Sequence, residues 1–181
     1  MSIAATRVMH SRLRKAYFPF SQLSPDIMLS LPAGNFAPVN TPPMTASQVE
    51  HSVETTASAQ AIWRLFSDVP GWKRWNPGIQ AIQISGPFAV GTTFQMTLPS
   101  GDVITSVLRE VRPNEAFVDE TEVGDLLVRV SHRIESLAQG HRRIVYDLKA
   151  IGPGAAEMGP AIASDFPDVL RALVSLAESL P

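Results

Sequence analysis

Two histidines and a tyrosine occupy the apolar sides of stretches whose residues alternate between apolar and polar. His51 lies between Val49 and Val53 on one such side, and His132 and Tyr146 lie on two others. An imidazole with an ordinary pKa near ~6.5 exchanges protons close to neutral pH, and a phenol donates a hydrogen bond to an oxygen. His132, Tyr146 and His51 are therefore our candidate catalytic residues, as acids, bases or groups that orient a ligand oxygen.

The competing interpretation assigns these side chains to the core. Each histidine is then a buried residue with satisfied hydrogen bonds, and Tyr146 fills space with its amphipathic ring. Three polar groups on apolar faces are more informative than one, because every buried polar atom needs a partner.

The stretches that carry His132 and Tyr146 form a predicted hairpin. Residues 126–137 and 142–151 both alternate, and residues 138–141 lie between them. The apolar faces of both stretches consist of residues with even sequence numbers. If both apolar faces point inward, the sequence numbers of two directly paired residues must therefore sum to an even number. That requires a loop with an odd number of residues, such as three with Gly140 at positive φ. This register places Tyr146 opposite His132 or one pair along.

Several chemistries have no residues to carry them. The chain has no cysteine, which excludes disulfides, thiol nucleophiles and cysteine-ligated metal sites. It contains no Gly-x-Ser-x-Gly elbow, phosphate-binding loop or dinucleotide fingerprint. Two histidines with no carboxylate predicted on the same faces make a poor metal site, so we expect neither a metal nor another cofactor.

Charge and hydropathy restrict the partners. The 181 residues carry 15 Lys and Arg against 17 Asp and Glu, a net charge of −2, and the pair Arg142 and Arg143 is too small for a nucleic-acid surface. No run approaches the ~18 consecutive apolar residues of a membrane span. We therefore expect a cytoplasmic monomer or homodimer that binds no nucleic acid and has no membrane span.

The first 45 residues differ in composition from the rest. They hold four basic residues and one acidic residue, and six of the 15 prolines, whereas residues 46–181 carry 11 basic and 16 acidic residues. Proline fixes φ and removes a backbone donor, so we expect residues 1–45 to be a disordered basic leader before a single domain. A transit peptide and a mis-assigned start, with translation beginning at Met44, are the open alternatives.

The pattern after residue 46 predicts an α+β domain. Alternation predicts a first strand over residues 48–55, and Ser58 is placed to cap a following helix. A run of further strands before the hairpin indicates an antiparallel sheet, although residues 103–111 mix apolar and polar groups on both faces and have no predicted orientation. A C-terminal helix ends the order, and Pro167 either kinks it or marks its start. The acidic residues Asp119, Glu120, Glu122 and Asp125 are predicted to be a solvated strand edge.

Scattered apolar and turn positions carry a resemblance to a known family. They are Ala61 to Asp68, Trp72, Trp75 to Ile79, Gly91 to Phe94, Gly140, and the pair Ala177 and Glu178. Together with the order of elements over residues 47–180, they resemble the START-like superfamily, and most closely its polyketide cyclase/dehydrase-type members, often labelled SRPBCC. Such positions are specific for a fold and poor for chemistry.

The resemblance implies a helix-grip fold, in which a curved antiparallel sheet wraps a long C-terminal helix around an internal cavity. It also implies that the first strand pairs with the last and the last with its predecessor. His51, Tyr146 and His132 would then lie on three adjacent strands that face the cavity. The residues expected to contact a ligand there are Trp75, Phe94, Met96, Val130, His132, Tyr146, Phe166 and Leu170.

Three functions follow as hypotheses. The leading one is binding of a small hydrophobic or aromatic molecule of the polyketide, lipid or isoprenoid class that the resemblance implies. The first alternative is an aldol-type cyclase or dehydratase, in which His132 or His51 is the acid or base and Tyr146 hydrogen-bonds the developing enolate. The second alternative is an adaptor or regulatory module without turnover.

Overall fold

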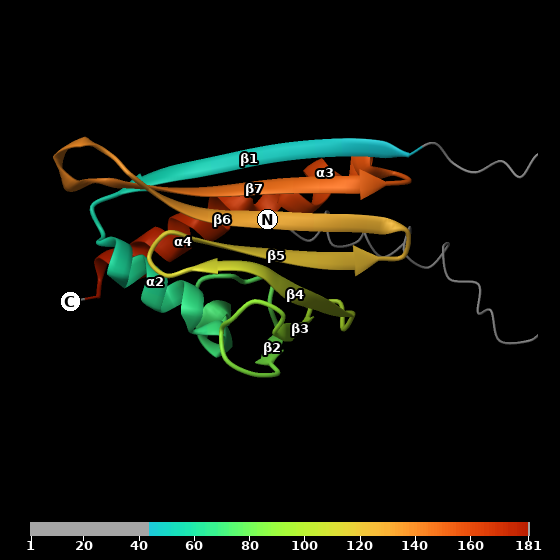
Figure 1. Ribbon diagram of the computed structural model, residues 1–181, viewed down its shortest axis with the longest axis horizontal. Coiled ribbons are helices and arrows are strands. Elements are labelled where there is room, and N and C mark those ends of the chain that lie inside the picture. Colours follow the sequence, from blue (N-terminus) through green and yellow to red (C-terminus); the bar gives the residue numbers. More distant parts are fainter. Residues whose placement is uncertain (1–43, 181) are drawn as a thin grey trace, which may run out of the picture. The chain divides into compact units, whose positions relative to one another are not determined.

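The computed structural model describes residues 44–180. The predicted leader lies outside the described residues except for its last two, so its disorder and the alternative start stay predictions. The elements in chain order are β1 (Thr45–Thr55), α2 (Ala59–Ser67), a 3-10 helix η1 (Val69–Arg74), β2 (Ala81–Ile84), β3 (Thr93–Thr97), β4 (Val103–Arg112), β5 (Ala116–Val123), β6 (Leu126–Ser136), a 3-10 turn η2 (Ala138–Gly140), β7 (Arg142–Gly152), α3 (Ala155–Ile162), a 3-10 turn η3 (Ala163–Asp165) and α4 (Phe166–Glu178) (Figure 1).

The seven strands form one antiparallel sheet in the order β1-β7-β6-β5-β4-β3-β2. The first strand therefore pairs with the last, as predicted, and β1 and β2 are the two edges. The β6–β7 hairpin has the predicted register, since Ser136 pairs with Arg142 and His132 pairs with Tyr146. Its turn includes Gln139 and Gly140 at positive φ, and Gly140 was the position predicted to need it.

Strand β4 explains why its sequence has no clear orientation. Its pairing with β5 shifts by one residue between Leu108 and Glu110, so one extra residue is inserted in β4. Because side chains alternate with a period of two, a bulge of this kind reverses which positions face inward. Ser106 and Leu108 face the interior before the bulge, and Val111, paired with Phe117, faces it afterwards.

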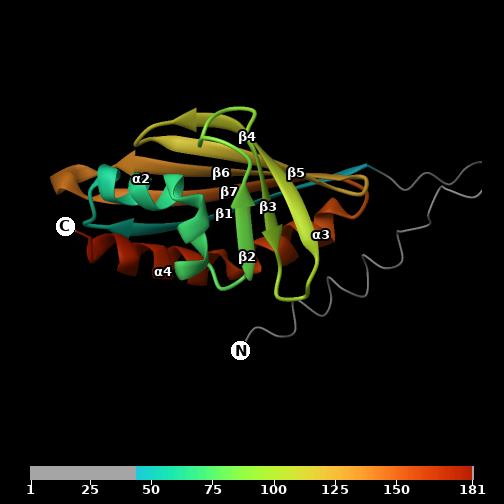
Figure 2. The same ribbon diagram turned by 90° about the horizontal axis from the view of Figure 1, so that it is seen from below.

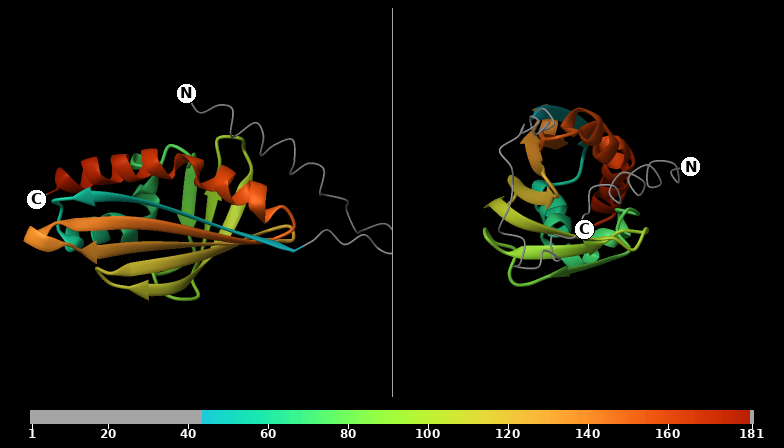
Figure 3. Two further views of the ribbon diagram at one scale, coloured as in Figure 1. Left: turned by 90° about the horizontal axis from the view of Figure 1, so that it is seen from above. Right: turned by 90° about the vertical axis from the view of Figure 1, so that its right-hand side faces the viewer.

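The helices cover the concave side of the sheet. Figures 2 and 3 show the sheet curving so that β2 and β3 run steeply across β1 and β7, with α3 and α4 following one another along β1. The predicted C-terminal helix is divided by η3, and Pro167 lies in the first turn of α4, so it marks a start. At the start of α2, the Ser58 hydroxyl accepts a hydrogen bond from the Ala61 N–H at 3.1 Å, which caps the helix as predicted.

Within residues 44–180, every helix falls short of the length and apolar character that a bilayer crossing requires.

The acidic group on β5 is partly buried, which corrects the prediction of a solvated edge. Strand β5 lies in the middle of the sheet, and Glu120 on its outer face is only 7% exposed. Its carboxylate accepts hydrogen bonds from Arg129 Nε at 3.1 Å and Arg109 Nε at 2.9 Å, and the bond from Arg129 is the main cause that lowers the pKa of Glu120. Glu122 and the turn residue Asp125 are exposed, as predicted.

Candidate functional site

The three predicted catalytic candidates form one row across the inner face of the sheet. His51 on β1 pairs directly with Tyr146 on β7, and Tyr146 pairs directly with His132 on β6. Phe117 on β5 continues the row beside His132. Directly paired residues project to the same side of a sheet, so these four rings share the side that the helices cover.

Aromatic contacts fix the orientation of His132. Its ring lies parallel to that of Phe117, with centroids 4.1 Å apart and an interplanar angle of 7°. Tyr146 meets the other side edge-on, at 4.3 Å and 81°. Phe66 from α2 and Phe166 from α4 contact the Tyr146 ring, at 6.4 Å and 5.4 Å. The imidazole is thus held between rings from several elements and has little freedom to rotate.

A buried carboxylate hydrogen-bonds His132, which corrects the expectation that no carboxylate shares these faces. His132 Nε2 lies 2.9 Å from Asp119 Oδ2, and the two residues are 8% and 7% exposed. An ionised carboxylate only accepts hydrogen bonds, so Nε2 carries a proton in this contact, and in the neutral imidazole Nδ1 is then an acceptor. Within residues 44–180, no group of three or more His, Asp or Glu side chains is placed to hold a metal ion.

Three buried polar atoms on this side of the sheet have no hydrogen-bond partner among residues 44–180. They are His132 Nδ1, the Tyr146 hydroxyl and Trp75 Nε1, and each belongs to a residue predicted to contact a ligand. Leaving a buried polar group unsatisfied costs about 1–3 kcal/mol. A fourth unsatisfied atom, Arg142 Nε, lies at the hairpin end of β7, where the guanidinium donates to carbonyls of the turn.

The electrostatic environment keeps Tyr146 protonated. Burial raises the pKa of its phenol well above the ordinary value of 10.0, and the nearby charges of Asp119 and Asp165 raise it further. Tyr146 therefore presents a neutral O–H at physiological pH. Burial also raises the pKa of Asp165, which lies in η3 between the two C-terminal helices.

The other predicted ligand contacts divide by burial. Phe94, Trp75 and Leu170 are buried in the larger of two apolar clusters. Met96, Val130 and Phe166 are only partly buried, and Phe166 packs against both clusters. His51 is also partly exposed and meets Phe166 edge-on at 6.4 Å. The inner face is thus buried at Phe94, Trp75 and Leu170 and less completely covered where Phe166 begins α4.

Four residues around the row of rings were not among the predicted site residues. Phe66, Phe117, Asp119 and Asp165 all contact or electrostatically influence the row. A signal for Asp119 was present, because it lies two residues from Phe117 in a predicted strand and so shares its face. The acidic residues around it made that strand look exposed.

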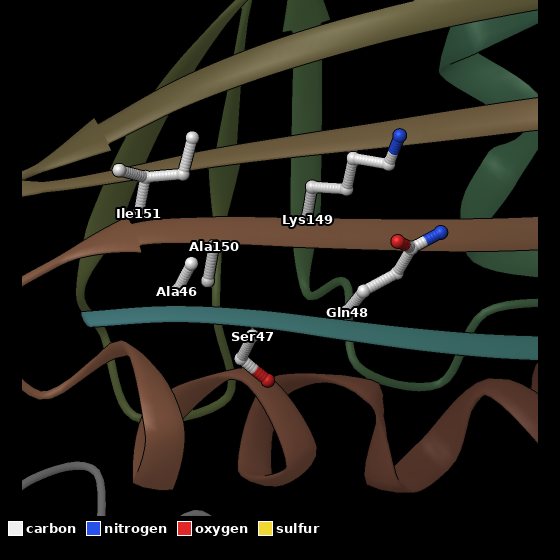
Figure 4. Close-up of a pocket in the computed structure, with 6 residues that line it drawn as sticks. All are labelled: Ala46, Ser47, Gln48, Lys149, Ala150 and Ile151. Carbon is white, nitrogen blue, oxygen red and sulfur yellow. The ribbon is translucent and has the colours of Figure 1, made fainter.

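A shallow groove elsewhere on the sheet is a separate feature. Strands β1 and β7 form it, and it is lined by Ala46, Ser47, Gln48, Lys149, Ala150 and Ile151. Figure 4 shows Gln48 and Lys149 projecting away from the helix, while Ser47 points toward it. None of the predicted site residues lines this groove, so it is distinct from the row of rings.

Solved structures share this fold at low sequence identity. The Zhui aromatase/cyclase from Streptomyces sp. R1128 superposes with a TM-score of 0.62 at 18% identity, covering 74% of this chain and 94% of that chain. A truncated norcoclaurine synthase from Thalictrum flavum gives 0.61 at 15%, covering 76% and 97%. Protein Mll3558 from Rhizobium loti gives 0.61 at 13%, covering 74% and 99%. These identities establish the fold alone, and they confirm the predicted helix-grip architecture.

The family assignment comes from the sequence itself. No curated protein matches the chain. The family model described as polyketide cyclase/dehydrase and lipid transport matches residues 46–178, nearly all of the described domain. The chain therefore belongs to the polyketide cyclase/dehydrase and lipid transport family, in agreement with its resemblance to START-like, SRPBCC proteins.

Proposed function

We propose that the protein binds a small, largely apolar and aromatic molecule between the sheet and α4, with polar atoms of the ligand at His132 and Tyr146. The observation that carries this proposal is the set of unsatisfied buried atoms, His132 Nδ1, Tyr146 hydroxyl and Trp75 Nε1. Polar atoms buried in an apolar core without partners destabilise a fold, so their retention favours a role in contacting something else.

The three atoms define what a ligand must offer. Tyr146 and Trp75 present donors, and His132 Nδ1 presents an acceptor. A ligand with a carbonyl or hydroxyl oxygen and one donor group would satisfy the pair formed by His132 and Tyr146, which are adjacent across two strands. The rings of Phe66, Phe117 and Phe166 around them favour a flat apolar body. The family's description, which includes lipid transport, supports the same class of molecule.

The partly buried residues indicate where such a molecule would enter. Val130 and Phe166 retain accessible surface although both belong to apolar clusters on the inner face. Phe166 begins α4 directly after the η3 break, so it lies where the helix layer is least regular. We therefore place the entrance between the start of α4 and β6.

Replacing Tyr146 with phenylalanine separates binding from stability. The substitution removes an unsatisfied hydroxyl, so the free energy of unfolding of the ligand-free protein should stay equal or rise. The dissociation constant for the neutral probe 2-(2-naphthyl)ethanol should increase about three- to tenfold, the value of one hydrogen bond of about 1 kcal/mol. Isothermal titration calorimetry measures the affinity, and urea unfolding measures the stability.

The matched control is Ser131→Ala, one residue from His132 on the outer face of β6. It should leave both quantities unchanged. Unaltered affinity in Tyr146→Phe together with a loss of stability would show that the hydroxyl has a structural role and would contradict the proposed site.

A second candidate function is acid–base catalysis on the bound molecule, and the Asp119–His132 hydrogen bond favours it. With Nε2 donating to Asp119, His132 Nδ1 is free to accept a proton from a carbon next to a ligand carbonyl. The imidazolium that forms is stabilised by the Asp119 carboxylate, and Tyr146 O–H can hydrogen-bond the developing enolate oxygen. His132 then gives the proton to a hydroxyl on the following carbon. The C–O bond to that hydroxyl breaks, a C=C bond forms from the enolate, and water leaves.

The test of catalysis is His132→Asn, which keeps a polar group and removes the base. A ligand co-purified with residues 44–181 and identified by mass spectrometry serves as substrate. If the protein is an enzyme, conversion should fall at least about a hundredfold while the dissociation constant changes less than tenfold. Equal conversion by the wild type and the variant would eliminate His132 as the base and leave the binding function.

A further inference from the structure

We infer that the site selects its ligand by charge, and that among aromatic molecules of equal size it takes those that carry a protonated amine and rejects carboxylates. This inference rests on the proposed binding function and adds the charge class of the ligand. The structural basis is the pair of carboxylates Asp119 and Asp165 on the Tyr146 side of the sheet. Asp119 is hydrogen-bonded to His132, and neither carboxylate is paired with a lysine or arginine of residues 44–180.

The two carboxylates reach the same point from different elements. Asp119 projects from β5 into the row of rings, and its hydrogen-bond partner is His132. Asp165 comes from η3, is partly buried, and makes no side-chain hydrogen bond or ion pair with other residues of the described range. Asp165 directly precedes Phe166, whose ring centroid lies 5.4 Å from that of Tyr146, and the charges of both carboxylates raise the pKa of Tyr146. That oxygen is itself buried, at 2% residue exposure, and unpartnered.

The basic residues of the sheet lie elsewhere. Arg109 and Arg129 both bind Glu120 on the outer face. Arg133 bridges Glu50 and Asp147 there, and Lys149 projects from the same side beside Gln48 (Figure 4). Arg142 is four residues from Tyr146 on β7 and so projects to the same side of the sheet. It lies at the hairpin end, however, and donates hydrogen bonds to carbonyls of the turn.

This sorting of charge has an energetic consequence. Within residues 44–180, arginines neutralise Glu120, Glu50 and Asp147 on the outer face, whereas the inner carboxylates have only the imidazoles of His132 and His51 as potential cations. A buried carboxylate without a cation is costly, and a ligand ammonium would supply the missing charge. A ligand carboxylate would instead place a third negative charge beside Asp119 and Asp165.

The surrounding groups are suited to an ammonium as well as to an aromatic body. His132 Nδ1 is an unpartnered acceptor for one of its N–H bonds, and the Tyr146 oxygen can accept another. The faces of Phe166 and Phe66 beside Tyr146 attract a cation through their ring quadrupoles. An anion could accept a hydrogen bond from the Tyr146 hydroxyl, but it would meet the carboxylates of Asp119 and Asp165 there.

The experiment uses three probes of nearly equal shape and different charge. They are 2-(2-naphthyl)ethylamine, 2-(2-naphthyl)ethanol and 2-naphthylacetate, titrated into the full chain by calorimetry at pH 7. We expect the amine to bind at least about tenfold more tightly than the alcohol, and the acetate at least about tenfold more weakly, which corresponds to about 1.4 kcal/mol for each step.

Two variants locate the selectivity. In Asp165→Asn the ratio of amine to alcohol affinity should fall toward one. Asp119→Asn should also reduce the ratio, although it changes the hydrogen bond to His132. The matched controls are Asp168→Asn on the exposed side of α4 and Glu122→Gln on β5, and both should keep the full ratio.

Asp165→Asn also carries an independent readout. Burial raises the pKa of its carboxyl in the folded protein, so ionisation of the carboxyl opposes folding. The stability that the wild type loses as the pH rises through this raised pKa should be absent from the variant. The ligand-free variant should therefore be at least as stable as the wild type at pH 7. Together with reduced amine selectivity, that result supports a binding role.

The possible failures are distinguishable. Equal affinity for the amine and the alcohol, or tighter binding of the acetate, would overturn charge selection and leave the proposed binding function intact. Failure of all three probes to bind would overturn the proposed function itself. An unchanged ratio in Asp165→Asn, with selectivity lost in Asp168→Asn, would overturn the assignment to the interior carboxylates.

Discussion

Replacing Phe117 with alanine is expected to lower the free energy of unfolding by about 3–5 kcal/mol, the cost of truncating a fully buried phenylalanine. Phe117 has no exposed surface and contacts Phe66, Trp72 and Phe88 with ring centroids 5.1, 5.6 and 5.2 Å away. Its removal leaves a cavity in the middle of the sheet, where rings from α2, η1 and the loop before β3 meet. Chemical denaturation in urea measures the loss.

Phe117→Ala should also weaken ligand binding by more than the loss of folding stability explains. Phe117 is the flat surface against which His132 lies, so its loss frees the imidazole to rotate away from Asp119. We expect weaker binding of 2-(2-naphthyl)ethanol under conditions where the variant is still folded. Phe117→Leu keeps most of the volume and should cost less than half as much. A loss below about 1 kcal/mol in Phe117→Ala would contradict the central position that we assign to this ring.

Part of the row of site residues was predictable, because every second residue of a strand faces the same side of the sheet. Alternation places His132 and Tyr146 inward, and an odd-length loop brings them opposite each other, a relation that needs only the positions along the chain. The neighbour relation of His51 needed more. Nothing in the local pattern says which strand lies next to β1, and that step came from the resemblance to a known fold.

The acidic residues of β5 show where local patterns stop being informative. Asp119 and Glu120 are adjacent, buried and on opposite faces, and each is stabilised by partners from other strands. Burial of a charged group depends on such partners, which a stretch of sequence does not display. The bulge in β4 is a similar case. One inserted residue switches which alternate positions of the strand face inward, so a single alternation pattern does not describe the whole strand.

Asp165 illustrates a further limit. The apolar stripe predicts a single C-terminal helix, and the break at η3 depends on how α3 and α4 each fit against β1. The close approach of α3 to β1 requires Gly159, where a Cβ would lie 2.8 Å from that of Ser47. With the break in place, Asp165 lies in η3 rather than in a continuous helix, so the role that we propose for it could not be inferred from helical periodicity.

The path from β7 into α3 gives the second large prediction. Gly152 ends β7 opposite Thr45 and has φ +135, a conformation that residues with a side chain rarely adopt. A Cβ at this position would also overlap the backbone carbonyl oxygen of Asp125. Strain and overlap act together, so Gly152→Ala is expected to cost about 3 kcal/mol or more.

Gly124→Ala is the control that separates these two effects. Gly124 also has positive φ, +59, but a Cβ there meets no atom within 4 Å, so the cost should be about 1–2 kcal/mol from the left-handed backbone alone. Urea unfolding of both variants gives the comparison, and equal losses would show that the β5–β6 turn yields to the added methyl group. We expect a larger loss in Gly152→Ala, together with weaker binding of 2-(2-naphthyl)ethanol. That result would support a role of the turn between β7 and α3 in positioning α3, and through it Asp165, against the row of rings.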